Sequence, residues 1–142
     1  MALKHYNAKE ITINFATLDL NKGAGPDEFI TVEEEEDYFD VTAGVDGELT
    51  RNEMPNNAMK VMITLMASSD TNDYLSAIHE ADRLTPGGAG VAPFLYRNRL
   101  GTDKLVSAEA FIMRRPQRAR AKKVGVMQWP FMVTYPANFN GS

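Results

Sequence analysis

The chain has 142 residues, of which 44% are hydrophobic and 24% charged, which is ordinary for one globular domain spanning residues 1–142. It has no cysteine, which excludes a disulfide framework and a thiolate metal site, and no apolar stretch long enough for a signal peptide or a membrane helix. The formal net charge of -4 disfavours a general nucleic-acid binder.

The first elements are expected to be extended. Residues 10–15 alternate apolar with polar side chains, which predicts a half-buried strand, and a turn is expected at 21–26. Residues 29–41 predict a second strand whose register changes, because Ile30 and Val32 share one parity while Phe39 and Val41 share the other. We therefore expect a bulge or a break within the run of glutamates.

A long hairpin loop is predicted over residues 42–57. It contains the turn dipeptide Asp46-Gly47 and lies between two predicted strands, since residues 60–66 alternate and form the return strand. Loops of about fifteen residues in compact domains are usually functional or mobile. We therefore expect this loop to carry a role of its own.

One helix is predicted over residues 72–84, with Ser69 or Asp70 as its cap. Its apolar stripe has helical spacing and comprises Leu75, Ile78 and Ala81, widened by Tyr74 and Ala77. The glycine-rich segment 85–90 ends the helix; it lacks the lysine of a phosphate-binding loop and follows a helix rather than opening one.

The remaining chain reads as strands over 94–97, 104–113 and 124–135, with a turn at 98–103. In the second of these strands, alternation predicts one apolar face made of Val106, Ala108, Ala110 and Ile112. Pro130 implies that the last strand lies at a sheet edge or contains a bulge. The elements predict a mainly β fold, an antiparallel β-sandwich or barrel with one packed α-helix.

The charges are sorted along the chain. Residues 27–53 hold eleven acidic side chains and one basic one, and residues 97–123 hold nine basic and two acidic ones. A domain with one negative and one positive region favours head-to-tail contact between its own copies. The pattern indicates a chain that assembles.

Catalytic and metal sites have little support. The acidic run 33–37 lacks the spaced Asp and Gly of a calcium loop, and alternation in a strand sends neighbouring carboxylates to opposite faces. His5 and His79 lie in no visible constellation with a nucleophile or a metal partner. We expect no enzyme activity, no metal and no cofactor, and we expect Trp129 to be a core residue rather than a ligand platform.

An ordered series of segments resembles the tail tube proteins of contractile-tailed bacteriophages. No single piece is a specific motif, but their order and spacing cover almost two thirds of the chain. The segments are residues 3–10, 32–40, 44–51, 68–73 and 86–91.

This resemblance implies hexameric rings that stack into a hollow tube inside a contractile sheath, with strands of each subunit forming a continuous inner β-barrel. A long hairpin loop would reach the adjoining ring, and DNA would pass through the bore without specific binding. The implied partners are other copies of the chain and the sheath, tape-measure, baseplate and tail terminator proteins, with no membrane. The implied location is the virion tail, assembled in the bacterial cytoplasm.

Three groups of residues are the candidates for these roles. An acidic bore repels DNA phosphates, so we expect Glu33 and Glu35 to line it, with Thr31, on the side opposite Ile30 and Val32. The expected stacking residues are Val45, Asp46, Gly47, Glu48, Leu49, Thr50, Arg51, Asn52 and Glu53. The expected contacts to another subunit or to the sheath are Arg114, Arg115, Arg118, Arg120, Lys122 and Lys123.

Two other interpretations remain open at this point. One is a tube protein of a phage-tail-like particle or of a secretion system, which has the same architecture. The other is a β-sandwich module that binds a sugar or another surface ligand, which would need an exposed aromatic platform.

Overall fold

The computed structural model describes residues 3–21, 23–25 and 28–141, so the turn expected at 21–26 lies partly outside the described residues. The chain forms mainly antiparallel strands and a single α-helix, which confirms the predicted fold class. The strands are β1 (Ile11–Phe15), β2 (Leu18–Asp19), β3 (Ile30–Glu34), β4 (Phe39–Ala43), β5 (Leu49–Glu53), β6 (Met59–Met66), β7 (Ala92–Asn98), β8 (Lys104–Ile112), β9 (Val126–Thr134) and β10 (Ala137–Phe139). The helices are a 3-10 turn, η1 (Ala8–Glu10), and α1 (Thr71–Leu84).

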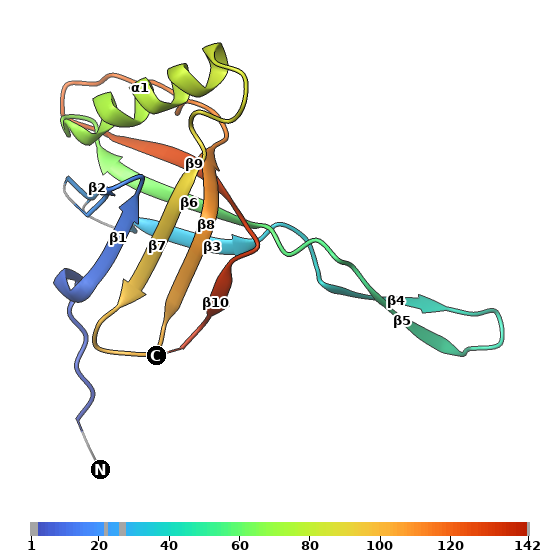
Figure 1. The fold of residues 1–142 in the computed structure, drawn as a ribbon. Coiled ribbons are helices and arrows are strands. Elements are labelled where there is room, and N and C mark those ends of the chain that lie inside the picture. The colour runs from blue at the N-terminus through green and yellow to red at the C-terminus, as the bar shows by residue number, and fades with distance from the viewer. Residues whose placement is uncertain (1–2, 22, 26–27, 142) are drawn as a thin grey trace.

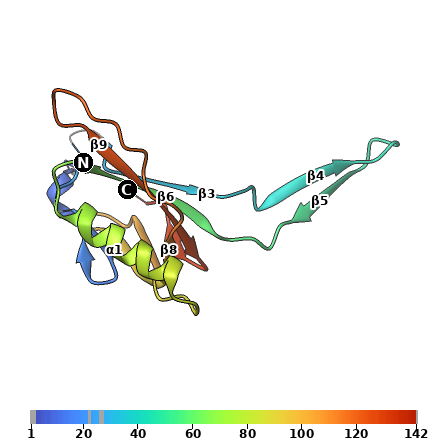
Figure 2. The same ribbon diagram turned by 90° about the horizontal axis from the view of Figure 1, so that it is seen from above.

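The main sheet is bent into two crossing layers. Its strand order is β2-β1-β7-β8-β9-β6-β3, and β10 pairs with the first part of β8. Figures 1 and 2 show β1, β7, β8 and β10 in one layer, β3 and β6 in the other, and α1 across one end. The path runs from β2 to β3 without joining its ends, so the sheet of one described subunit does not close into a barrel.

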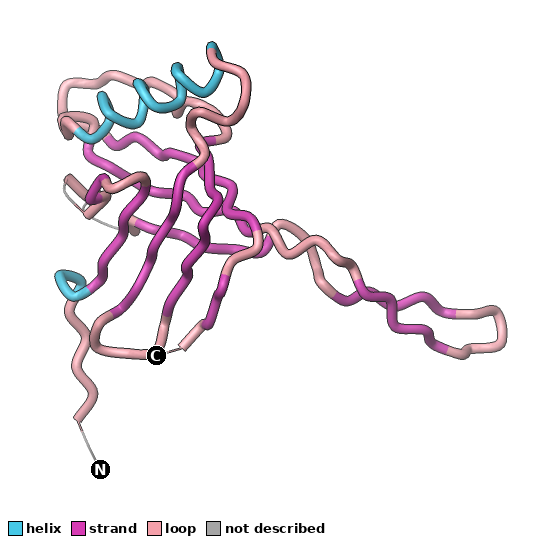
Figure 3. Tube along the Cα trace, in the orientation of Figure 1, coloured by secondary structure: helices cyan, strands magenta, loops and turns pink. Residues whose placement is uncertain are grey.

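A two-stranded arm projects from the bent sheet. Within the described ranges, strands β4 and β5 pair only with each other, and Figure 3 shows them as a hairpin extending far from the rest of the chain. The predicted break in the glutamate run is confirmed, because β3 ends at Glu34 and β4 starts at Phe39. The prediction of a long hairpin loop over 42–57 was wrong for seven of its sixteen residues, since residues 42–43 and 49–53 are strand. Residues 49–53 contain a single apolar side chain, Leu49, so their composition does not favour a strand.

The core lies between the two layers. Alternate residues of β1 and β6 are buried, which confirms the period-2 prediction for both strands. Three phenylalanines meet at its centre, where the ring of Phe131 lies 4.9 Å from Phe15 and 5.7 Å from Phe94. Ile30 and Val32 of β3 pack against this core, as their parity predicts.

Helix α1 is held to the sheet by few residues. Leu75 is fully buried and Ile78 packs against the core, but Ala77 and Ala81 are exposed and Tyr74 is 58% exposed. The predicted apolar stripe was therefore too wide: only part of it packs on the sheet, because the helix covers only one end of the sheet. Its first turn is fixed by Trp129, whose indole Nε1 donates a 2.8 Å hydrogen bond to Asn72 Oδ1.

Strand β8 changes parity at a bulge. The register between β7 and β8 shifts between Ala92 and Phe94, so Ser107 is buried before the shift and Ala110 after it. The Ser107 hydroxyl accepts a 3.1 Å hydrogen bond from Glu109 N–H. The predicted face of Val106, Ala108, Ala110 and Ile112 is thus divided: the first two are exposed and the last two buried. One extra residue in a strand sends the residues beyond it to the other face.

Pro130 lies in an interior strand, because β9 is paired on both sides in the sheet order. The expectation of a sheet edge was therefore wrong. The Pro130 carbonyl accepts a 2.9 Å hydrogen bond from Met113 N–H, so its backbone groups point towards β8, which ends at Ile112. Proline has no N–H to donate to a neighbouring strand, and at this position β8 has already ended. The proline is therefore tolerated here for the same reason as at a sheet edge.

Among the described residues, no helix is both long and apolar enough to cross a bilayer.

Asn72→Ala is expected to lower the free energy of unfolding of the unassembled subunit by about 1–3 kcal/mol, because the buried Trp129 N–H would lose its acceptor. Chemical denaturation followed by tryptophan fluorescence measures this change. Asn52→Ala is the control, since the Asn52 amide donates only to the exposed Thr42 hydroxyl. Equal stabilities of the two variants would contradict this role for Asn72.

Candidate assembly surfaces

The arm has a tight tip. The Gly47 N–H donates a 3.0 Å hydrogen bond to Gly44 O, and Glu48 N–H donates a 3.1 Å bond to Asp46 Oδ1. Gly47 has a φ of 87°, which favours glycine and confirms the turn predicted at Asp46-Gly47. The nine predicted stacking residues, Val45 to Glu53, therefore form the tip and the whole of β5.

One face of the arm is apolar and uncovered. Cross-strand register places Phe39, Val41 and Leu49 on one side, and these side chains are 47%, 58% and 67% exposed. The Arg51 guanidinium lies 4.4 Å from the centre of the Phe39 ring, a cation–π contact on the same side. The opposite side carries Asp40, Thr42, Thr50 and Asn52. An isolated hairpin is only marginally stable in water, so this apolar face is suited to contact another molecule.

The predicted bore residues lie at and beyond the end of β3. Glu33 is exposed and stands opposite Lys60 of β6 in the strand register. Glu35 follows the strand; its N–H donates to Ala58 O over 3.2 Å, and its Oε2 accepts from Asn56 Nδ2 over 3.1 Å. Thr31 is exposed on the same side of β3 as Glu33, so the open face of this layer carries charges of both signs.

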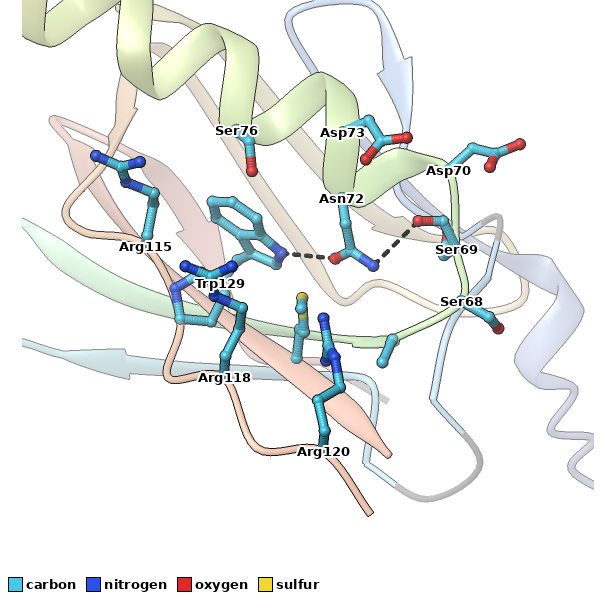
Figure 4. Close-up of a pocket in the computed structure, with 13 residues that line it drawn as sticks. Ser68, Ser69, Asp70, Asn72, Asp73, Ser76, Arg115, Arg118, Arg120 and Trp129 are labelled. Carbon is cyan, nitrogen blue, oxygen red and sulfur yellow. Dashed lines mark hydrogen bonds between the residues drawn. The ribbon is translucent and has the colours of Figure 1, made fainter. Parts of the chain in front are cut away.

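The six predicted basic residues all lie in the exposed loop that joins β8 to β9. The Arg115 guanidinium is already engaged, because its Nη2 lies 3.2 Å from Glu80 Oε2 of α1. Figure 4 shows Arg115, Arg118 and Arg120 on one side of a recess of about 600 Å³, with Asp70 and Asp73 at the start of α1 on the other. Both signs of charge therefore line this recess.

A second polar contact closes the turn between β7 and β8. Tyr96 Oη donates a 2.6 Å hydrogen bond to Asp103 Oδ2. Burial, and then this hydrogen bond, raise the pKa of Tyr96 above its ordinary value. The phenol therefore stays neutral at physiological pH and has a structural role. In the described ranges, no three His, Asp or Glu side chains come together as a metal site.

Sequence reasoning missed the apolar face of the arm. Its signal was the alternation of Phe39, Val41 and Leu49 with polar residues on both sides of Asp46-Gly47. Phe39 and Val41 were predicted as strand residues and Leu49 as a loop residue, so the face that the three share was not predicted.

The chain is similar to phage structural proteins. The family model of the bacteriophage PhiTE tail tube protein matches residues 7–136. Structural protein ORF10 of Pseudomonas phage KPP10 is 28% identical over 131 residues, which cover 90% of this chain and 76% of that protein. The cryo-EM structure of the anti-feeding prophage cap, the AFP tube terminating cap, aligns with a TM-score of 0.59 at 8% identity over 99% of this chain and 95% of the other. At that identity the likeness concerns the fold alone.

Replacing residues 39–53 with an Asn-Gly turn is expected to leave the unfolding free energy of the subunit almost unchanged. The arm pairs only with itself, and Tyr38 O already accepts a 2.7 Å hydrogen bond from Met54 N–H at its base, so the two ends are adjacent. Circular dichroism and chemical denaturation of the unassembled protein test this. A loss above about 2 kcal/mol would contradict it, because surface changes rarely cost that much.

Proposed function

The chain belongs to the family of the bacteriophage PhiTE tail tube protein, and from this membership we propose that its copies form hexameric rings that stack into the tube of a contractile tail. The family is one of structural proteins, and the proposal assigns no catalysis to this chain. The observation that supports it most directly is the projecting arm, whose apolar face is not covered by any described strand of its own subunit. Contacts between unlike surfaces of identical copies close into rings or extend as filaments, and a tube needs both.

The arm is the proposed stacking element. Burying a large apolar side chain contributes about 1.5–3 kcal/mol, and each subunit offers Phe39, Val41 and Leu49 on one face. A hairpin that reaches beyond its own subunit can place these side chains against the next ring. The predicted stacking residues Val45–Glu53 are part of this arm, and Phe39 and Val41 of β4 join them in the proposal.

The proposed bore lies along the open face of β3 and β6, with Glu33 and Glu35 at its wall. Acidic side chains repel DNA phosphates, so DNA would pass without being held. Lys60 stands across from Glu33 and reduces the negative potential there. The acidity of the proposed bore therefore depends most on Glu35 and on the acidic residues that follow it.

The basic loop between β8 and β9 is a proposed contact to an acidic surface, either a neighbouring subunit or the sheath. Five of its six cationic residues, Arg114, Arg118, Arg120, Lys122 and Lys123, lie exposed with no ion pair among the described contacts. Tape-measure, baseplate and tail terminator proteins are the other proposed partners. A ligand-binding module has less support, since the candidate platform residue Trp129 is 1% exposed.

Purified protein at high concentration is expected to form rings and tubes visible by negative-stain electron microscopy.

Phe39→Ser with Leu49→Ser should leave folded subunits that make few or no long tubes, because each stacking contact would lose roughly 3–6 kcal/mol of apolar burial. Asp40→Ser with Thr42→Ser, on the opposite face of the arm and outside the predicted stacking residues, is the control and should still elongate. Tubes of normal length from the serine variant would show that the arm does not stack the rings.

A phage carrying Glu33→Lys with Glu35→Lys is expected to assemble tails but to deliver DNA poorly, because added cations in the bore would bind phosphates. Plaque counts and DNA-ejection assays measure the effect. Glu33→Gln with Glu35→Gln is the matched control, which removes charge without reversing it and should have the smaller effect. Undiminished infectivity of the lysine variant would place these side chains outside the bore.

A further inference from the structure

We propose that neighbouring subunits of a ring are joined by parallel pairing between β3 of one copy and the segment 125–129 of the next, which is Gly125 and the first half of β9. This rests on the proposed ring, and it names the two edges and the strand direction that would close it. The two edges belong to opposite sides of the same three-stranded layer, β9-β6-β3.

The outer edge of β3 carries backbone groups without a strand partner. Two hydrogen bonds fix the phase of the pairing with β6: Thr64 N–H donates to Phe29 O, and Glu35 N–H donates to Ala58 O. Backbone groups in an antiparallel pair point alternately to the two sides of the strand. Odd-numbered residues of β3 therefore bond to β6, and Ile30, Val32 and Glu34 direct their N–H and C=O groups to the free edge, where no strand of the described chain lies.

Among the described residues, the first half of β9 has no strand partner on its other side, and the basic loop lines a recess together with Met127 and Trp129. Ala67 N–H donates to Gly125 O, so odd-numbered residues of β9 face the β6 side, and Met113 N–H donates to Pro130 O, so even-numbered ones face β8. Strand β8 ends at Ile112, opposite Phe131. Val126 and Gln128 thus direct their backbone groups to a side that β8 does not reach, and Val126 is 46% exposed.

The pleat of the two edges permits only one direction of pairing. On β3, the residues whose backbone faces the free edge, Ile30 and Val32, have side chains on the core side. On β9, Gln128 has its backbone on the free edge but its side chain exposed, while its neighbours Met127 and Trp129 are buried. Directly opposed residues of an antiparallel pair both bond to each other and share a face, so an antiparallel joint would set core residues beside exposed ones.

A parallel joint removes this conflict. In a parallel pair, a residue that bonds across the joint lies beside one whose backbone points away, and the two share a face. Val32 would then lie beside Met127 on the core side, and Glu33 beside Gln128 on the open side. Copies in a cyclic ring all point the same way along the axis, and β3 runs parallel to β9 because each is antiparallel to β6. Ring symmetry therefore requires the same direction that the pleat permits.

Burial and charge fit this register. Ile30 and Val32 are only half-buried, whereas their partners Ile63 and Val61 in β6 are 0% and 1% exposed, so the core side of β3 is only partly covered. In this register Glu34 would lie beside Trp129. The proposed hydrogen bonds between the two strands would end there, because the next residue, Pro130, has no N–H to donate. Met113 is hydrogen-bonded to Pro130, so Arg114 and Arg115, which follow it, leave the sheet at the same place. Their positive charges would lie near the glutamates of the neighbouring copy.

Cysteine cross-linking tests the joint, since the chain has no cysteine of its own. Glu33→Cys with Gln128→Cys is expected to form disulfides between copies under mild oxidation, giving a ladder of covalent multimers up to the ring on a non-reducing gel. Glu34→Cys with Gln128→Cys is the matched control: it removes the same kind of charge one residue away, but on the other face. It should remain largely monomeric on the gel.

The outcomes separate this joint from the proposed function. Rings seen by electron microscopy without the Glu33–Gln128 cross-link, or with stronger linkage in the control, would overturn the parallel β3–β9 joint while leaving the tube function intact. A wild-type protein that never forms rings would overturn both. Amide exchange on the unmodified protein is a second measurement: Ile30, Val32, Glu34 and Gln128 should exchange fast in the subunit and become protected in the ring. Continued fast exchange in rings would also overturn the joint.

Discussion

The structure depends on the need of every strand to find partners for its backbone N–H and C=O groups, and β9 meets that need for two layers at once. Residues 126–133 of β9 pair with β6, and residues 131–134 also pair with β8. The same strand carries Trp129, Phe131 and Val133 into the core, and through the Trp129 indole it fixes the first turn of α1. A change in β9 would therefore affect both layers and the helix together.

The central strands of the sheet are therefore paired within the subunit, but its edge strands differ in how far their backbone groups are bonded. Backbone groups of β1 find partners within the chain, because the Asn21 side chain takes the place of a neighbouring strand. It accepts a hydrogen bond from Ile13 N–H and donates one to Ile11 O, each over 2.7 Å. Strand β3 has no such cover among the described residues. Exposed edges normally lead to uncontrolled pairing, and a ring in which each edge meets its counterpart is one way to remove them.

Apolar and charged side chains have separate roles in this protein. The ion pairs of the described chain both involve Glu80 and are solvent-exposed, so they contribute little to the stability of the fold. Stability comes from the apolar core, while the acidic stretch around β3 and the arm and the basic loop before β9 remain available to other molecules. Opposite charges on two surfaces of one subunit favour orderly association of copies and disfavour like-to-like contacts.

The sequence by itself determined the local elements: the alternation in β1 and β6, the single helix, the break in the glutamate run and the turn at Asp46-Gly47 were all predictable, because each depends on neighbours in the chain. Only the tertiary structure decided that residues 49–53 form a strand, that Ala108 is exposed and that Pro130 lies inside the sheet. Each of these depends on a partner strand far away in sequence: β4 gives β5 its pairing, β7 sets the position of the β8 bulge, and the end of β8 accommodates the proline. The positions of the candidate assembly residues follow the same division, since their charges can be read from the chain, whereas the face on which each one lies is set by strand pairing.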